Sequence, residues 1–313
     1  MKMHFAKYLC NGNDYLLLDG RRCEIPSREV MAAMCERTGG AGARGVVVLR
    51  SGDKNIRLHC FDAAGVEVRP SGDDLLCGAR FAMDVGAVNS GDRVAVDTFS
   101  GEMAFVAAPE GVTLRLPDVE GVYAIDNFFF FNLITPQYVE AADDLTPIDP
   151  VELAMDINRS ESFEQIGGAG VTFMQQVVGE EEKGDLMAVS LELGQRDASP
   201  GYAAGAVAAA IGAALMREND GQPAFHHSRA EYNYEDYPYG DETQEEEDDD
   251  DTAPLLIRWL KRRDETLPVA VTYPAGGYTV RFSRSEEGIF KEIEVTATVR
   301  KIFEGEFDDE IFC

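Results

Sequence analysis

The sequence predicts a mixed α/β protein made of two β-rich halves, each folded around a central helix. The chain has 313 residues, which suits two domains of ordinary size. The order of predicted elements in residues 1–121 recurs in residues 122–299. Each half also contains a glycine-containing loop followed by a helix of small residues, and small residues let a helix sit tightly inside a wrapping sheet. The repeated order therefore predicts two matched lobes.

In the first half, a peripheral helix is predicted after Ser27, whose side chain can cap it. The central helix is predicted over 75–83, with Ser71 or Asp73 as its cap. Short apolar or alternating runs between turn signals predict strands at 15–18, 46–49, 57–61 and within 94–116.

The second half repeats this order. A peripheral helix is predicted over 150–157, and a loop rich in Gly, Ser and Pro at 194–201 opens the central helix 203–210. Strands are predicted at 128–134, 171–178, 186–193, 267–273, 278–282 and 293–299. In both halves, a glycine loop ahead of a helix presents free N–H groups and the positive end of the helix dipole. Two such starts in matching positions favour a site for an anion such as a substrate carboxylate.

Composition excludes several classes of function. The formal net charge of −29 disfavours nucleic-acid binding, because the chain would repel a phosphate backbone. Twelve acidic and no basic residues lie in 231–251, so the segment near 218–265 is predicted to be a disordered acidic insert. No apolar stretch is long enough for a membrane span, and residues 1–5 do not look like a signal peptide, so we expect a cytoplasmic protein.

The cysteines and histidines give no metal or disulfide signature. Six cysteines are scattered with no C-x-x-C pair, and without an export signal they are expected to be buried thiols. The four histidines include the adjacent pair His226-His227, which cannot share one helix face, so no metal site is predicted.

Many short segments, in order along the chain, resemble the motifs of one family. Residues 71–77 align without a gap to C-G-N-G-A-R-C, and residues 35–45 resemble D-R-x-x-G-x-G-x-D-G, with Arg44 where an acid is usual. The other matching segments are 12–15, 61–65, 135–137, 173–175, 192–194, 205–209, 274–277 and 303–306. Together they resemble the diaminopimelate epimerases over nearly the whole chain, apart from the acidic insert.

The resemblance implies a fold, a chemistry and a division of the chain. Two pseudo-symmetric lobes, 1–121 with 300–313 returning to it and 122–299, would close over a small amino-acid-like ligand. In that family two cysteines, one at each central helix start, act as thiolate base and thiol acid on opposite faces of a Cα–H, without a cofactor. A helix N-terminus lowers a thiol pKa, which suits this role. The family also dimerises, so a homodimer or a pair with an intact epimerase paralogue is expected.

The reactive positions depart from the family. Ser71 stands at the first cysteine position, and a hydroxyl is a very poor acid compared with a thiol. The second position falls on Tyr202, or on Gly201 if the one-residue gap is placed differently. Cys77 matches a non-catalytic cysteine and is expected to be a buried packing thiol. Ser71 and Tyr202 are therefore expected to be inactive remnants.

The residues that the resemblance assigns to substrate binding have changed as well. They are Asn13, Asp62, Gly72, Asp73, Thr135 and Glu192, of which Asp62, Asp73 and Thr135 replace asparagines. Gly170 replaces a further asparagine, and Leu193 replaces an arginine. Loss of the arginine removes a partner for a carboxylate, and the two added acids would repel a dicarboxylate such as diaminopimelate.

Three functions remain open at this point. The first is a non-catalytic paralogue that serves in binding or assembly. The second is a cofactor-independent isomerase of altered chemistry, because related folds isomerise with carboxylates; it would use Ser71, Asp73, Asp74, Glu192 or Tyr202. The third is a true diaminopimelate epimerase of lysine or peptidoglycan precursor synthesis, whose second half would then lack a cysteine before Cys313.

Overall fold

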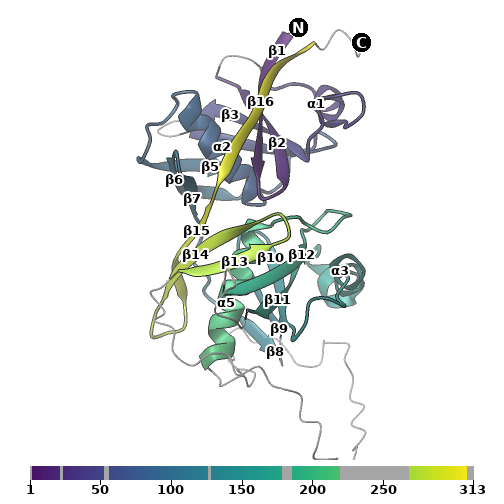
Figure 1. Ribbon diagram of the computed structural model, residues 1–313, viewed down its shortest axis with the longest axis vertical. Coiled ribbons are helices and arrows are strands. Elements are labelled where there is room, and N and C mark those ends of the chain that lie inside the picture. The colour runs from purple at the N-terminus through teal and green to yellow at the C-terminus, as the bar shows by residue number, and fades with distance from the viewer. Residues whose placement is uncertain are drawn as a thin grey trace, which may run out of the picture.

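The computed structural model describes residues 2–21, 24–52, 56–125, 128–177, 185–218 and 268–308. Two lobes lie one above the other and strand β16 crosses from the second to the first (Figure 1). The prediction of a mixed α/β, strand-rich fold is confirmed. The predicted acidic insert lies almost wholly outside the described residues.

In the described residues, the first lobe contains nine elements before the chain leaves it. They are β1 (Lys2–Cys10), β2 (Asn13–Asp19), α1 (Arg28–Cys35), β3 (Gly45–Ser51), β4 (Ile56–Asp62), α2 (Asp73–Asp84), β5 (Arg93–Thr98), β6 (Gly101–Ala108) and β7 (Gly111–Arg115). Ser27 caps α1 as predicted, because its hydroxyl accepts the N–H of Val30.

The second lobe follows with the same order of elements, apart from the additional strand β8 and the additional short helix α4. They are β8 (Tyr123–Ile125), β9 (Phe128–Asn132), β10 (Pro136–Ala141), α3 (Pro150–Arg159), α4 (Glu161–Gln165), β11 (Gly170–Gln176), β12 (Leu186–Leu191), α5 (Ala203–Glu218), β13 (Val269–Tyr273), β14 (Gly276–Arg284) and β15 (Phe290–Ala297). The short helix α4 was not predicted. Among the described helices, none combines the length and apolar character that a membrane span needs.

Strand pairing shows that the two lobes are structural repeats. In the first lobe two neighbouring pairs are parallel, β2–β3 and β4–β5. The other pairs, β1–β2, β3–β4, β5–β6 and β6–β7, are antiparallel. The second lobe repeats this series from β9–β10 to β14–β15. Pairing of β7 with β15 joins the two into one sheet, which has 16 strands in the part of the chain that the structure describes.

The sheet ends in the described residues at β8 on one side and at β16 (Val299–Asp308) on the other. Strand β16 pairs with β1, at the far end of the sequence. The boundaries of the two domains near 121 and 299 stay a prediction.

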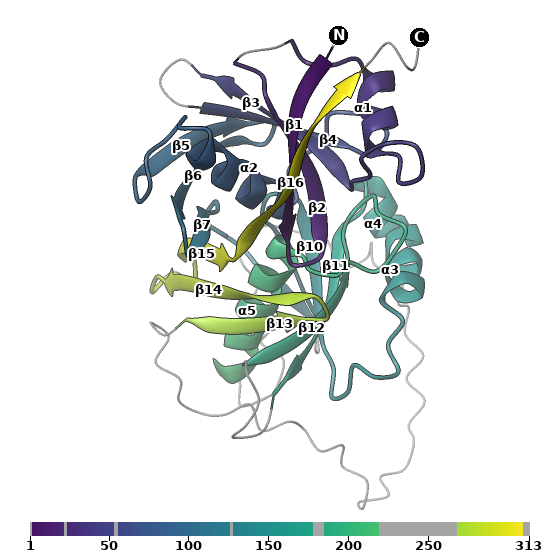
Figure 2. The same ribbon diagram turned by 45° about the horizontal axis from the view of Figure 1, so that its top comes forward.

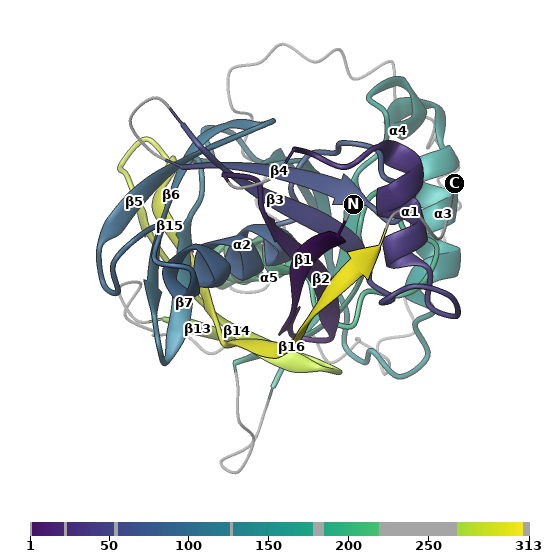
Figure 3. The ribbon, with the colours of Figure 1, turned by 90° about the horizontal axis from the view of Figure 1, so that it is seen from above.

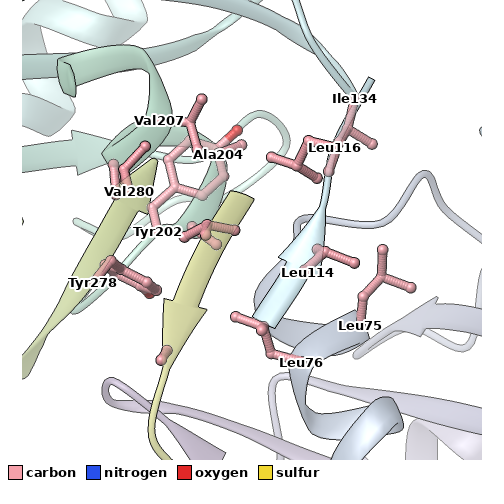
Figure 4. Packing of buried hydrophobic residues seen from close by; sticks show 14 of the residues in the cluster. Leu75, Leu76, Leu114, Leu116, Ile134, Tyr202, Ala204, Val207, Tyr278 and Val280 are labelled. Atoms are coloured by element: carbon pink, nitrogen blue, oxygen red, sulfur yellow. The ribbon is translucent and has the colours of Figure 1, made fainter. Parts of the chain in front are cut away.

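The central helices α2 and α5 lie inside the wrapped strands, whereas α1 and α3 lie on the outside of their lobes (Figures 2 and 3). Residues of α2 and α5 belong to one continuous cluster of buried apolar side chains. Figure 4 shows where the lobes meet, with Leu75 and Leu76 of α2 across from Tyr202 and Ala204. The small residues of α5 are needed here, because a Cβ at Gly205 would lie 2.6 Å from Thr172 Oγ1 of β11.

Candidate functional site: the interface between the two helix starts

The first helical hydrogen bonds of α2 and α5 define corresponding positions at the two helix starts. The carbonyl of Gly72 accepts the first helical hydrogen bond of α2 from Leu76 N–H, and the carbonyl of Tyr202 accepts that of α5 from Ala206 N–H. Gly72 has a φ of +101°, which favours glycine. By this correspondence Ser71 and Gly201 are the residues that precede the two helix caps.

The cap of α2 differs from the prediction. Neither Ser71 nor Asp73 caps this helix; the N-cap is Gly72, which has no side chain to offer, and Asp73 is already helical. Instead, the carboxylate of Asp74 accepts the N–H groups of Ser71, Gly72 and Leu75 at 2.7 to 3.1 Å. The protein's own anion therefore binds the N–H groups that precede and open this helix.

A hairpin tip of the first lobe is inserted against the second lobe. Asn11 and Gly12 join β1 to β2 with φ values of +42° and +87°, the two-residue turn that an Asn-Gly pair favours. A Cβ at Gly12 would lie 2.6 Å from Pro200 Cβ and 2.7 Å from Ala275 Cβ. The Asn11 amide donates to the carbonyl of Gly277 at 3.0 Å. The tip thus packs between a loop and a hairpin of the other lobe.

Asp73 is the buried centre of the contact between the lobes. It has no exposed surface and accepts hydrogen bonds from Asn13 Nδ2 at 2.8 Å, Tyr278 OH at 2.7 Å and Cys10 Sγ at 3.5 Å. Tyr278 belongs to β14 of the second lobe, and the same Asn13 amide also donates to the carbonyl of Gly201. Burial raises the pKa of Asp73 to about 6, against the hydrogen bond from Tyr278, which lowers it.

A second connection joins the lobes through an ion pair. Arg44 Nη2 lies 2.6 Å from Glu192 Oε2, and the two side chains are only 14% and 13% exposed. Burial raises the pKa of Glu192 to about 7, although Arg44 opposes this effect. Arg44 lies in the loop after α1. It is the residue that departs from the family motif, and it pairs with Glu192, which matches the family motif.

Tyr202 fills the space at the start of α5. It is 1% exposed, and its hydroxyl accepts a hydrogen bond from Gln137 Nε2 at 3.0 Å; the same amide donates to Thr135 Oγ1 at 2.8 Å. A Cβ at Gly170 would lie 2.5 Å from the Tyr202 hydroxyl. The glycine that replaces a family asparagine therefore makes room for this tyrosine. Burial raises the pKa of Tyr202 well above its usual value.

The remaining predicted residues divide into those near the interface and one outside it. Ser71 is 7% exposed, and its hydroxyl lies 3.3 Å from that of Tyr15, whose pKa burial raises well above its usual value. Cys77 is fully buried, as predicted, and the described thiols Cys10, Cys35, Cys60 and Cys77 are free. Asp62 is used elsewhere: its carboxylate accepts the N–H groups of Ala64 and Val66 and closes the turn after β4.

The arrangement is an acidic, closely packed contact. The charge of Arg44 lowers the pKa of Asp73 and of Glu192, whereas the charge of Asp74 raises both. Within the described ranges, no cluster of three or more His, Cys, Asp or Glu side chains could hold a metal ion. A cavity of about 530 Å³ lies elsewhere, in the first lobe, and is lined by residues that include Arg21, Ile56 and Arg93.

Sequence reasoning missed several partners at this site, and Tyr278 and Asn11 show why. Tyr278 was assigned only to a strand, because an aromatic residue in a strand is ordinarily a core residue. Asn11 was not singled out, although the Asn-Gly pair is itself a hairpin signal that could have drawn attention to it.

Comparison with known proteins supports the resemblance. No family model matches the chain. The diaminopimelate epimerase of Flavobacterium psychrophilum is 25% identical over 178 residues, which are 56% of this chain and 68% of that protein. That of Rippkaea orientalis is 34% identical over 106 residues, or 32% of this chain and 38% of that protein. The chain thus spans about two thirds of the first relative and well under half of the second.

Solved structures extend the likeness over the whole fold. A phenazine biosynthesis protein of the PhzF family from Bacillus anthracis superimposes with a TM-score of 0.64 at 12% identity, over 98% of this chain and 99% of that one. A hydroxyproline epimerase from Agrobacterium vitis, solved with bound trans-4-hydroxy-L-proline, gives 0.59 at 12% identity over 97% and 92%. The chain therefore has the two-lobed diaminopimelate epimerase-like fold, and the curated diaminopimelate epimerases are its relatives in sequence.

Proposed function

We propose that this chain is a non-catalytic relative of the diaminopimelate epimerases that serves in binding or assembly. One observation carries the proposal: no side chain fits at Gly201, the residue that corresponds to Ser71 at the second helix start. A Cβ there would lie 2.6 Å from Asn11 O, 2.7 Å from Asn11 Cβ and 2.8 Å from Tyr278 OH. The hairpin tip and Tyr278 therefore fill the volume that a second thiol would need.

The first helix start supports the same conclusion. Ser71 needs a base to act in proton transfer, and the side chain that meets its hydroxyl is the neutral phenol of Tyr15. The positive end of α2 is neutralised by Asp74 rather than left for a substrate carboxylate. Neither helix start then offers what the two-thiol reaction needs, a low-pKa acid–base group and an accessible anion site.

A distal substrate carboxylate would also lack a partner. Leu193 stands where the family has an arginine, and Arg44 is already paired with Glu192. Asp73 and Glu192 would repel a second carboxylate at close range. If the chain binds a small molecule, we propose an amino-acid-like ligand with a neutral or cationic side chain. For assembly, the proposed partners are a second copy of the chain and an intact epimerase paralogue.

Hydrogen exchange at the substrate Cα tests the proposal. The protein is incubated in D2O with LL-diaminopimelate and with a panel of amino acids, and deuterium uptake is followed by mass spectrometry, with a curated diaminopimelate epimerase as positive control. We expect no uptake with the wild type, and none with Ser71→Cys, because one thiol has no opposed partner. Uptake on diaminopimelate by the wild type would refute the proposal.

An isomerase that uses carboxylates is a second candidate, and the raised pKa values of two buried acids favour it. Burial raises the pKa of Asp73 to about 6 and that of Glu192 to about 7, values suited to proton transfer near neutral pH. This candidate predicts exchange on an amino acid other than diaminopimelate, with a pH midpoint near 6, that is abolished by Asp73→Asn and retained by Ser71→Ala. Exchange that survives Asp73→Asn would exclude it.

A further inference from the structure

We propose that the cavity in the first lobe binds a free α-amino acid with a large apolar side chain. The cavity has a volume of about 530 Å³, a size typical of small-molecule sites. It lies where α2 ends, because Ala87 and Val88 of its lining come shortly after that helix. The contact between the lobes lies at the start of α2, and a helix of this length extends about 18 Å. The cavity is therefore a separate site, and this inference does not rest on the proposed absence of catalysis.

The cavity exists because two neighbouring strands start at different levels. Pairing between β4 and β5 begins with Ile56 opposite Val96. Residues 93–95 of β5 extend beyond this point and, in the described part of the chain, pair only with β6. The lining includes all three of them together with Ile56. The space beside β5 is thus left open at this end of the sheet.

Hydrogen bonds fix the chain that closes the cavity on the side of the helix. Gly86, with a φ of +65°, ends α2, and the N–H of Ala87 donates to the carbonyl of Ala82, which closes the last helical turn. Further along, the Asn89 amide donates to the Asp92 carboxylate at 2.9 Å, and Asp92 N–H donates to the carbonyl of Asn89 at 3.3 Å. Asp92 is therefore held in place by its own turn.

The lining is charged where it is exposed and apolar where it is covered. Its exposed residues include Asp92 and Arg93. Its buried or partly buried residues are apolar, namely Ile56, Ala87, Val88, Val94 and Ala95. A few polar groups beside an apolar interior fix the orientation of a small ligand. The ligand that suits this lining has an apolar end that is buried and a charged end close to solvent.

The charges of the lining decide which groups the exposed end of the ligand carries. Arg21 is already neutralised, because its Nε and Nη2 each lie 2.8 Å from an oxygen of the Asp19 carboxylate. The guanidinium of Arg93 has no hydrogen-bond or ion-pair partner among the described residues, and Asp92 carries the opposite charge beside it. A simple anion would be repelled by Asp92 and a simple cation by Arg93. A carboxylate and an ammonium on one carbon complement both, whereas a peptide carries these two groups at opposite ends.

Isothermal titration calorimetry of the full chain with L-phenylalanine tests the proposal. One buried side chain and two partly exposed ion pairs predict a dissociation constant on the order of 1 mM. 3-Phenylpropanoate lacks the ammonium and 2-phenylethylamine lacks the carboxylate, so each should bind at least about threefold more weakly. L-Alanine leaves the apolar part of the cavity empty and should bind at least about tenfold more weakly.

Substitutions at the charged end show which group of the ligand each residue binds. Arg93→Met should weaken the binding of L-phenylalanine about threefold but should not weaken that of 2-phenylethylamine, which has no carboxylate to lose. Asp92→Asn should weaken the binding of L-phenylalanine by about the same factor but should not weaken that of 3-phenylpropanoate. The matched controls Arg159→Met and Asp156→Asn replace an exposed arginine and an exposed acid on α3, and they should leave the binding of all three compounds unchanged.

Filling the cavity shows whether it is the binding site. Val88→Phe places a ring in the apolar part and should abolish measurable binding of L-phenylalanine, whereas Val66→Phe, at an exposed residue beyond the other end of β4, should not. Circular dichroism checks that each variant is folded; if Val88→Phe is not, the substitutions of the exposed Asp92 and Arg93 decide alone. No saturable binding of L-phenylalanine, or binding that Arg93→Met and Arg159→Met affect equally, would overturn the proposal. Deuterium uptake tests the proposed function separately, so either proposal can fail without the other.

Discussion

Removing the hydroxyl of Tyr278 should reveal how strongly Asp73 connects the two lobes. In Tyr278→Phe the aromatic ring stays, and the hydroxyl loses its 2.7 Å hydrogen bond to the Asp73 carboxylate and its hydrogen bond with the neutral side chain of Asn11. A hydrogen bond to a buried charged group contributes about 1.5 to 3 kcal/mol, whereas a neutral one contributes about 1 kcal/mol. Because burial raises the pKa of Asp73 to about 6, this carboxyl is ionised at pH 8 and protonated at pH 5.

The loss of unfolding free energy should therefore depend on pH. We expect about 2 to 3 kcal/mol at pH 8 and about 1 kcal/mol at pH 5, measured by urea unfolding with circular dichroism. Tyr273→Phe is the matched control: Tyr273 is equally buried and packs edge-to-face on Tyr278, but its hydroxyl lies 2.9 Å from the neutral Ser190. It should cost about 1 kcal/mol at both pH values. Equal losses for Tyr278→Phe at pH 8 and pH 5 would refute the reasoning.

Three further predictions concern the same interface. The folded protein binds extra protons on Asp73 and Glu192 between about pH 4 and 7, because burial raises both pKa values. The free energy of unfolding should therefore fall by about 3 to 5 kcal/mol as pH rises through that window. Asp73→Asn should make this fall smaller. Gly201→Ala should cost about 3 kcal/mol or more in urea unfolding, against under about 0.5 for Gly39→Ala, where a Cβ meets nothing. Arg44→Leu should cost about 3 to 5 kcal/mol at pH 8, and the added change Glu192→Leu should restore most of it; no recovery would contradict a desolvated ion pair.

The sequence predicted the lobes well because their signals are local and repeated. Apolar runs, glycine loops and small-residue helices each depend on a few neighbouring residues, and their order recurs in both halves. The capping of α1 by Ser27 was predicted correctly for the same reason. The start of α2 was not, because its cap is a glycine and the carboxylate that accepts the N–H groups of Ser71 and Gly72 belongs to Asp74, inside the helix.

Contacts between the lobes could not be predicted from local patterns. The partners of Asp73 include Tyr278, which is 205 residues away, and Arg44 pairs with Glu192 at a separation of 148. Asp62 was assigned to the site by motif, yet its carboxylate closes a turn. The sequence left the second thiol position open between Gly201 and Tyr202; the first hydrogen bond of α5, which Tyr202 accepts, is not visible in a local pattern.

The pairing of β1 with β16 affects how the chain can fold while it is being synthesised. Strand β1 is synthesised long before its neighbour on the outer side, which consists of residues 299–308. The sheet of the first lobe is therefore complete only after residues 299–308 have been made, and such distant pairing slows folding. Until then β1 is itself an open edge. A chain that stops short of residue 299 would keep that edge exposed and should be prone to aggregation.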